Sequence, residues 1–323
     1  MACAPRQTPL TGAWLPATHA QRAGCRKPAS NPPQGADQGL AFSPADNCSL
    51  GGPSSLQPDT RLLMLGDSTV RYQFDAILSW LRRSGATVHC KPAKPPTWSD
   101  PMLAESAYDN LPVDCSSPTR GFAAARMLNL LPGAGARGAA QFYDEMFAPA
   151  GPNGVVVLSA GPWYGVKRRR KSPAEAAAEL QADFAALQRL ACARGAAWPR
   201  LLWREQLPQH FEGGGAYKGK VTKACAPLGA ADAAAVYERS SVPLLAAVRA
   251  AAAAGCARPL GWIPAFWPLV GRHDEHLERT FRGGGANANA SRTAQRADCT
   301  HYLACSSSMR LLNRLLLSAV HQD

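Results

Sequence analysis

The chain has 323 residues, of which 46 % are apolar and 18 % are charged, so it can bury the core of one large domain or of two small ones. Its formal net charge of +12 attracts polyanions in general. Because it contains no zinc finger, RNP motif or basic heptad helix, we do not expect it to bind nucleic acid.

Residues 1–58 are rich in Pro, Gly, Asn and Ser, a composition that favours an irregular segment over an independent domain. We expect Cys25 and Cys48 to pin this segment. Regular structure begins directly after it, so we assign residues 59–323 to the main domain.

Short apolar runs alternate with helical patterns in the main domain. This alternation predicts an α/β fold with a mostly parallel sheet covered on both faces, a three-layer α/β/α domain. In such sheets, sites form beyond the carboxyl ends of the strands. The expected strands are residues 61–65, 155–158, 200–203 and 261–264, and the expected helices are 67–83, one that begins at 172–173, 233–254 and 303–320.

Ten cysteines are scattered along the chain and none forms a CxxC pair, so we do not expect structural zinc. An even, scattered set is typical of disulfides formed in an oxidising compartment. The sequons at Asn47 and Asn289 agree with this interpretation, and free buried thiols in a cytosolic protein are the alternative. The cysteines are Cys3, Cys25, Cys48, Cys90, Cys115, Cys192, Cys225, Cys256, Cys299 and Cys305.

No stretch reaches the about 18 apolar residues of a membrane span, and the N-terminus lacks the apolar run of a signal peptide. If the protein is secretory, we expect its leader or membrane anchor to lie outside this chain.

Residues 167–171 (KRRRK) form a dense basic run. Most short charge runs are solvated loops, which is the interpretation we favour. A site for an anionic substrate or donor is one alternative. A nuclear localisation signal is another, and it fits poorly with disulfides.

Gly66, Asp67 and Ser68 lie where the first expected strand ends and its helix begins. A helix N-terminus offers free N–H groups and a partial positive charge, which can hold the oxyanion formed when Ser68 attacks a carbonyl. Glycine at position 66 permits a tight turn with no side chain crowding the substrate. The alternative is that Asp67 or Ser68 only caps the helix.

A base and an orienter for Ser68 occur near the other end of the chain. Asp298 and His301 are three residues apart, immediately before the last expected helix, so both lie on one side of a single turn. His301 can take the Ser68 proton while Asp298 holds the other ring nitrogen. The sequence therefore predicts a serine-nucleophile acyl-transfer site, with no metal or organic cofactor.

These two blocks together resemble the SGNH (GDSL-type) hydrolase superfamily and, more narrowly, the plant trichome-birefringence-like and PC-esterase group. Residues 66–73 (GDSTVRYQ) are similar to that group's GDSxxRNQ block, with Tyr72 in place of Asn. Residues 298–302 (DCTHY) are similar to its DCxHW block, and the helix around residues 309–313 follows as the group's terminal helix does.

Weaker similarities extend the resemblance over most of the chain. Residues 203–213 (WREQLPQHFEG), followed by Cys225, resemble the group's RxxSPxHF stretch. Residues 272–276 (RHDEH) resemble a degenerate RxDxHPS segment. Residues 12–14 and 42–48 faintly resemble its cysteine-rich N-terminal region.

The resemblance implies further site residues. Arg71, one turn after Ser68, is expected to stabilise the oxyanion or to hold the nucleophile loop, and an ordinary surface salt bridge is the alternative. Asp67, His210 and His276 are assigned to substrate binding. A structural role is the alternative that we favour for both histidines.

Residues 159–164 (SAGPWY) align with the group's NTGHWW segment, whose Asn helps to bind the oxyanion. Ser159 takes that place here, and with Gly161 it completes the expected oxyanion hole in altered form. Trp163 and Tyr164 can stack on a sugar ring, although aromatic residues near a strand end more often belong to the core.

The resemblance implies acetyl transfer from an acyl donor to the hydroxyls of a cell-wall or extracellular polysaccharide in the Golgi or secretory pathway. An esterase remains open, because water and a sugar hydroxyl attack the same acyl-enzyme. A non-catalytic polysaccharide-binding protein is a further alternative, motivated by the missing Asn and the basic run. We also expect a disulfide at Cys299 or Cys305 to pin the catalytic loop.

Overall fold

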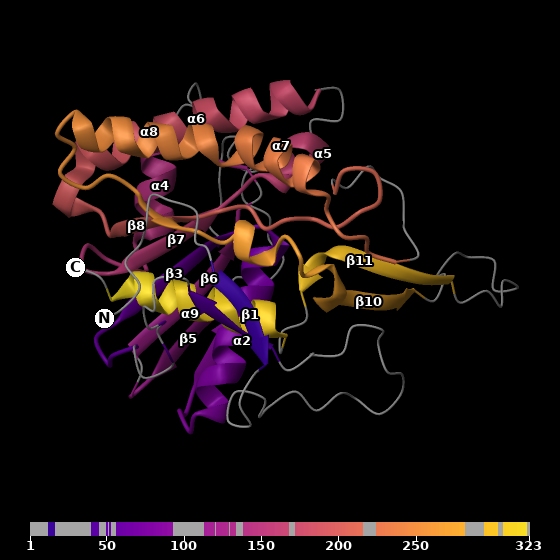
Figure 1. Ribbon diagram of the computed structural model, residues 1–323. Coiled ribbons are helices and arrows are strands. Elements are labelled where there is room, and N and C mark those ends of the chain that lie inside the picture. Colours follow the sequence, from indigo (N-terminus) through magenta and orange to yellow (C-terminus); the bar gives the residue numbers. More distant parts are fainter. Residues whose placement is uncertain are drawn as a thin grey trace, which may run out of the picture.

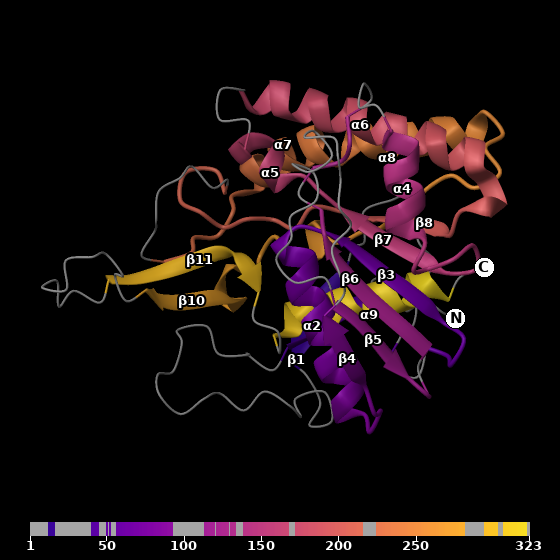
Figure 2. The same ribbon diagram turned by 180° about the vertical axis from the view of Figure 1, so that it is seen from behind.

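The structure is a computed structural model of the chain (Figures 1 and 2). It describes residues 12–16, 40–44, 50, 52, 56–92, 113–119, 121–128, 130–133, 138–167, 172–215, 224–281, 294–302 and 306–321.

A mixed sheet of seven described strands forms the centre of the molecule. Its strands are β3 (Arg61–Gly66), β4 (His89–Pro92), β5 (Val113–Ser117), β6 (Gly121–Met127), β7 (Val155–Ser159), β8 (Arg200–Arg204) and β9 (Gly261–Ile263). Their order is β4-β5-β6-β3-β7-β8-β9, and all neighbours from β6 to β9 are parallel. Strand β5 runs antiparallel to β4 and β6. The four expected strands are confirmed, and β4, β5 and β6 are added to them.

Helices cover both faces of this sheet (Figures 1 and 2). Alternate β3 side chains point to opposite faces, so Leu62 and Met64 pack with α2 and α9, whereas Leu63 and Leu65 pack with α4, α6 and α8. The expected α/β class with a mostly parallel sheet is therefore confirmed. The helices are α2 (Ser68–Arg83), α4 (Ala139–Phe147), α5 (Pro162–Lys167), α6 (Pro173–Arg194), α7 (Ala230–Ser240), α8 (Val242–Ala253) and α9 (Ser307–Val320).

The single helix expected at residues 233–254 is in fact two helices. Helix α7 ends at Ser240 and α8 begins at Val242, with Ser241 between them. Pro243 lies in the first turn of α8, where its missing N–H is tolerated. This proline is the signal for a break that the apolar periodicity hides.

Two antiparallel strand pairs lie outside the main sheet. Strand β1 (Gly12–Pro16) pairs with β2 (Leu40–Pro44), which contacts α9, so the expected irregular segment contains regular structure at these two places. Strands β10 (His276–Phe281) and β11 (Ala294–Tyr302) form a ribbon that projects from the body in both views (Figures 1 and 2).

Three disulfides join described residues, as the scattered cysteines predict. Cys90 and Cys115 link β4 to β5, Cys192 in α6 is joined to Cys256 beyond α8, and Cys225 is joined to Cys299 in β11. Such bonds persist in oxidising compartments and indicate a non-cytosolic environment. In the described part of the chain, no helix is both long and apolar enough to cross a membrane.

Candidate active site

The nucleophile candidate lies at the carboxyl end of β3, as the strand-to-helix pattern predicts. Gly66 is the last residue of β3 and Ser68 the first residue of α2. A Cβ atom at position 66 would overlap Val70 and the main-chain oxygen of Ser159. The glycine is therefore required by the close packing of β3 against β7 and α2, a different reason from the open substrate space expected from sequence.

Ser68, His301 and Asp298 form one chain of hydrogen-bonding contacts. The Oγ atom of Ser68 lies 2.6 Å from Nε2 of His301, and Nδ1 of His301 lies 2.7 Å from Oδ2 of Asp298. His301 and Asp298 are 15 % and 17 % exposed, so a solute can reach the site without any opening of the core.

The Asp298 carboxylate is held in its charged form. Burial raises its pKa, but the hydrogen bond and charge of His301 oppose this, and so do the N–H groups of Thr300 and His301, which donate to the carboxylate. The net result is a pKa below the usual value for aspartate. An ionised Asp298 can fix the ring of His301 with its Nδ1 proton toward the carboxylate.

Residues 299–301 bulge out near the end of β11, because Asp298 and Tyr302 pair with the consecutive residues Leu277 and His276. This bulge, the catalytic loop that carries His301, is held by a disulfide and by hydrogen bonds. The Cys225–Cys299 disulfide joins it to the segment after residue 224, and the main-chain N–H of His210 donates to the Cys299 oxygen at 3.0 Å. The side chain of Gln209 donates to Thr300 at 3.0 Å. The expectation that a disulfide at Cys299 pins this loop agrees with the structure, and Cys305 lies outside the described residues.

His210 and His276 are buried against the main chain of this loop. Both are buried, at 0 % and 3 % exposure, and His210 Nδ1 lies 2.6 Å from His276 Nε2. The outer nitrogens face the main-chain oxygens of Val270 and His301 at 2.8 and 3.2 Å. All four ring nitrogens face partners inside the protein, which agrees with a structural role for both histidines and leaves no nitrogen for an acceptor sugar.

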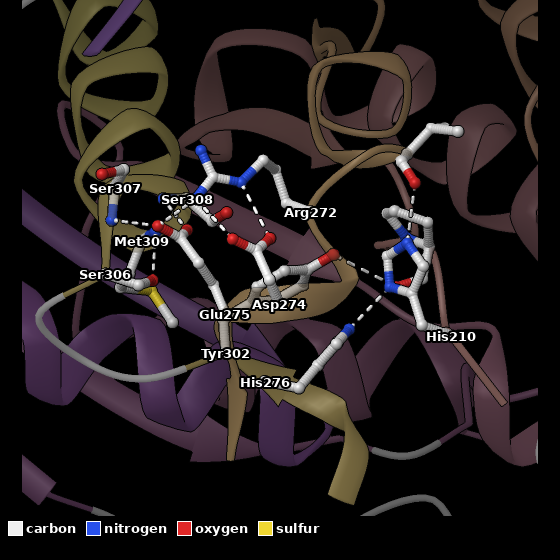
Figure 3. A network of polar contacts seen from close by, with 12 residues as sticks. His210, Arg272, Asp274, Glu275, His276, Tyr302, Ser306, Ser307, Ser308 and Met309 are labelled. Atoms are coloured by element: carbon white, nitrogen blue, oxygen red, sulfur yellow. Dashed lines mark hydrogen bonds and ion pairs between the residues drawn. The ribbon is translucent and has the colours of Figure 1, made fainter. Parts of the chain in front are cut away.

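The start of α9 is anchored by the same segment as His276 (Figure 3). The buried carboxylate of Glu275 accepts hydrogen bonds from the N–H groups of Ser307 and Ser308 at 3.2 and 2.7 Å, and it pairs with Arg272. The hydroxyl of Ser306 accepts from the Met309 N–H. These contacts satisfy the free N–H groups of the helix that follows the catalytic loop.

Ser159 ends β7 beside Gly66, and a buried arginine lies beneath it. Arg204, the last residue of β8, donates to the Ser159 hydroxyl at 2.9 Å and to the Thr69 hydroxyl at 2.7 Å from the same Nη2 atom, and to Gln73 at 2.9 Å from Nη1. Arg204 is 1 % exposed. Sequence analysis gave Arg204 no role, although a charged residue that closes a buried apolar strand was a visible signal.

Two residues expected to bind substrate are buried instead. Asp67 is the N-cap of α2, and its Oδ1 accepts from the N–H and hydroxyl of Thr69 at 2.8 and 2.6 Å. Tyr164 is 2 % exposed, and its hydroxyl donates to Asp183 and accepts from Leu131 N–H. Asp67 therefore supports the nucleophile turn, and the ring of Tyr164 belongs to the core, so neither is free to bind a sugar.

The other expected residues remain near the site. Arg71 forms an ion pair with Asp75 one turn further along α2, the geometry of the salt-bridge alternative. Gly161 follows β7 and lies so close to Gln206 that a Cβ atom would overlap its amide. Trp163 is half-buried against the core, with part of its surface open.

Tyr72 adds a contact that sequence analysis did not assign. Its ring lies 4.6 Å from that of His301, centre to centre, on the face of α2 that carries Ser68. The basic residues 168–171 and both sequons lie outside the described residues.

No protein-family model matches the chain, and no curated protein has a significantly similar sequence.

Proposed function

We propose that this protein is an O-acetyltransferase that moves an acetyl group, by way of an ester on Ser68, to a hydroxyl group of a polysaccharide. The observation that carries the proposal is the unbroken contact chain from Ser68 through His301 to Asp298 at the carboxyl edge of the sheet. This is the arrangement of a nucleophile, a base and an orienter.

In the first half-reaction, His301 Nε2 takes the proton from the Ser68 hydroxyl as Oγ attacks the carbonyl carbon of the acyl donor. Asp298 stabilises the imidazolium that forms. The tetrahedral intermediate then collapses, the bond to the leaving group breaks, and His301 returns the proton to the leaving group. Ser68 is left as its acetyl ester.

In the second half-reaction, His301 takes the proton of a sugar hydroxyl, whose oxygen attacks the ester carbonyl. Collapse of this second intermediate breaks the bond to Ser68 Oγ, which regains its proton from His301. The products are the acetylated sugar and the free enzyme, so no redox partner is required.

Oxyanion stabilisation comes from the start of α2. Ser68 is the first residue of the helix, and an N–H group at this position has no partner within the helix. Ser159 lies beside Gly66 at the end of β7 and is 2 % exposed. Unlike the buried ring nitrogens of His210 and His276, its hydroxyl proton has no acceptor within the described residues, so it can donate a second hydrogen bond. Each such donor is typically worth about 10²–10³ in rate.

The acceptor class follows from the sequence resemblance. Both blocks that carry the triad are similar to those of the trichome-birefringence-like group, which implies a cell-wall or extracellular polysaccharide and the Golgi as the compartment. The disulfides of the described chain fit a secretory location.

Hydrolysis is a second candidate reaction, favoured by the partial exposure of the triad. Water can reach His301 and Asp298, and it attacks the same acyl-enzyme as a sugar does. An esterase and a transferase with this triad differ only in which acceptor reaches the ester first.

The test is to follow the protein by intact mass spectrometry after incubation with an activated acetyl ester, with and without a panel of oligosaccharides. Ser68→Ala is the inactive variant, and Ser79→Ala is a matched control on the same helix. Acetylation that depends on Ser68 and then appears on a sugar supports the transferase. Acetylation lost only to water supports the esterase.

If neither Ser68-dependent acetylation nor turnover is seen, the enzyme proposal is contradicted. Unchanged glycan binding by Ser68→Ala in the same experiment would then support a polysaccharide-binding protein.

A further inference from the structure

One nitrogen of Arg204 joins the two sides of the proposed oxyanion site. Its Nη2 atom donates to Thr69, in the first turn of α2 next to the nucleophile, and to Ser159, at the end of β7. Thr69 and Ser159 lie on different elements, and Arg204 comes from a third, β8. A guanidinium can reach both hydroxyls because its donors are fixed in a planar fork.

Burying the positive charge of Arg204 costs free energy, so its partners must compensate for the loss of water. Desolvation lowers the pKa of Arg204 to about 10, opposed by the negative charge of Asp67, so the side chain still carries its positive charge at neutral pH. A buried charge is costly unless it is paired and hydrogen-bonded. Asp67 balances it through Thr69, whose hydroxyl donates to Asp67 Oδ1 and accepts from Arg204.

The contact also decides where the proton of Ser159 points. Because Arg204 donates to the Ser159 oxygen, that hydroxyl must direct its own proton away from the guanidinium. Within the described residues, no acceptor is found for this proton. An adjacent positive charge also makes the hydroxyl a stronger donor.

We infer that Arg204 is a positioning residue that fixes the Ser159 hydroxyl as an oxyanion donor and ties it to the turn of the nucleophile. The inference rests on the proposed acyl-transfer function and deepens it. A serine hydroxyl rotates freely and by itself gives no fixed donor direction, whereas the amide of an Asn has its N–H bonds set by its plane. Arg204 supplies the direction that the serine lacks.

The test is a double-mutant cycle on turnover of an activated acetyl ester, with wild type, Ser159→Ala, Arg204→Lys and the double variant. Lysine keeps the charge but has no fork, so it cannot hold both hydroxyls in the same geometry. We expect Arg204→Lys to lower kcat about 10–100-fold with little change in KM when Ser159 is present. In the Ser159→Ala background we expect the same substitution to lower kcat less than about 3-fold.

Two further variants separate positioning from loss of stability. Gln73→Leu removes the one contact of Arg204 described above that involves neither Thr69 nor Ser159, and its thermal midpoint is measured beside that of Arg204→Lys. If Arg204→Lys does not fold, Thr69→Val replaces it in the cycle, because it removes the other hydroxyl held by the same nitrogen.

Equal losses of kcat in the two Ser159 backgrounds would overturn the inference and leave the proposed function intact. If Ser68→Ala turned over the ester as fast as wild type, the proposed function would be overturned and the inference with it. A loss of kcat on Arg204→Lys that is seen only when Ser159 is present supports both the inference and the proposed function.

Discussion

His301 Nε2 lies 2.6 Å from Ser68 Oγ, although the two residues are 233 positions apart in the chain. The turn from β3 to α2 presents the serine, and the last residues of β11 present the histidine. The contact therefore depends on how firmly the loop around His301 is held against the sheet. The main-chain N–H of His210 and the ring of His276 both contact main-chain oxygens of that loop.

Asp298→Asn tests the orienting role of the carboxylate. An amide can present its NH₂ group to Nδ1 and favour the wrong tautomer, so we expect kcat to fall by about 10⁴-fold, with the fold retained. Steady-state turnover of an activated acetyl ester and circular dichroism measure the two properties. Asp59→Asn, an exposed change just before β3, is the control and should leave kcat unchanged. A rate close to wild type would remove Asp298 from the triad.

The site was predictable where a strand end, a helix start and a short motif coincide. Ser68 follows a strand with a buried apolar run at residues 62–65, and Asp298 and His301 precede an amphipathic helix, so both blocks could be placed at element ends. Sequence spacing gives no information on which side chains lie under such a block. The burial of His210, His276 and the ring of Tyr164 depends on tertiary packing, which only the structure supplies.

The sequence pattern predicts the strands from β3 to β9 and misses the three strands on the other side of β3. Strands β3, β7 and β8 are short apolar runs, whereas β4, β5 and β6 are rich in polar or small residues. Strand β6 reads GFAAARM, and its alanines are buried by the sheet without giving a strong apolar signal. The Cys90–Cys115 pairing also reflects cross-strand register, which spacing in the chain does not show.

Glu275→Gln tests the anchor of α9. The Glu275 carboxylate is 0 % exposed, pairs with Arg272 and accepts from two N–H groups of the helix start, so its neutral replacement leaves Arg272 without its buried partner. We expect the free energy of unfolding to fall by about 3–5 kcal/mol, measured by urea denaturation. Asp274→Asn weakens a more exposed contact of the same arginine and should cost about 1 kcal/mol or less. Equal effects would contradict a special role for Glu275.

The hydrogen-bond network through His210 and His276 has one contact more than the two neutral rings have N–H protons. Three contacts run from the Val270 oxygen through both rings to the His301 oxygen, and two neutral imidazoles carry only two protons for them. The shorter contacts, at 2.8 and 2.6 Å, fit these two protons. His276 Nδ1 is then unprotonated, 3.2 Å from the His301 oxygen.

This pair predicts acid sensitivity of folding. Burial lowers the pKa of His210 to about 4 and that of His276 to about 3, the latter with a further contribution from His210. Below about pH 6.5 these two histidines bind protons in the unfolded chain but not in the folded chain. Their contribution to the free energy of unfolding is therefore fully present above that pH and is lost as the pH falls toward 4. The expected slope is up to about 1.4 kcal/mol per pH unit for each histidine.

Urea unfolding between pH 7.5 and 4.5 measures this slope. His276→Gln removes one titrating group, so its stability should depend less steeply on pH than that of wild type. His89→Gln, a change at an exposed histidine of β4, should keep the wild-type slope. A wild-type stability that is flat over this range would show that the two histidines bind protons equally in the folded and unfolded chains, and would contradict the prediction.

Loss of the Cys225–Cys299 disulfide should affect activity more than loss of Cys192–Cys256. The two bonds close similar lengths of chain, with sequence separations of 74 and 64, so each serine double variant should lose a comparable about 2–4 kcal/mol of stability. Only Cys299 lies in the loop between Asp298 and His301. We therefore expect kcat for the activated ester to fall at least about 10-fold in Cys225→Ser/Cys299→Ser, measured well below its thermal midpoint, because small displacements of a base are costly. Cys192→Ser/Cys256→Ser should keep kcat near wild type, and equal kcat values in the two variants would show that the hydrogen bonds from His210 and Gln209 hold the loop without the disulfide.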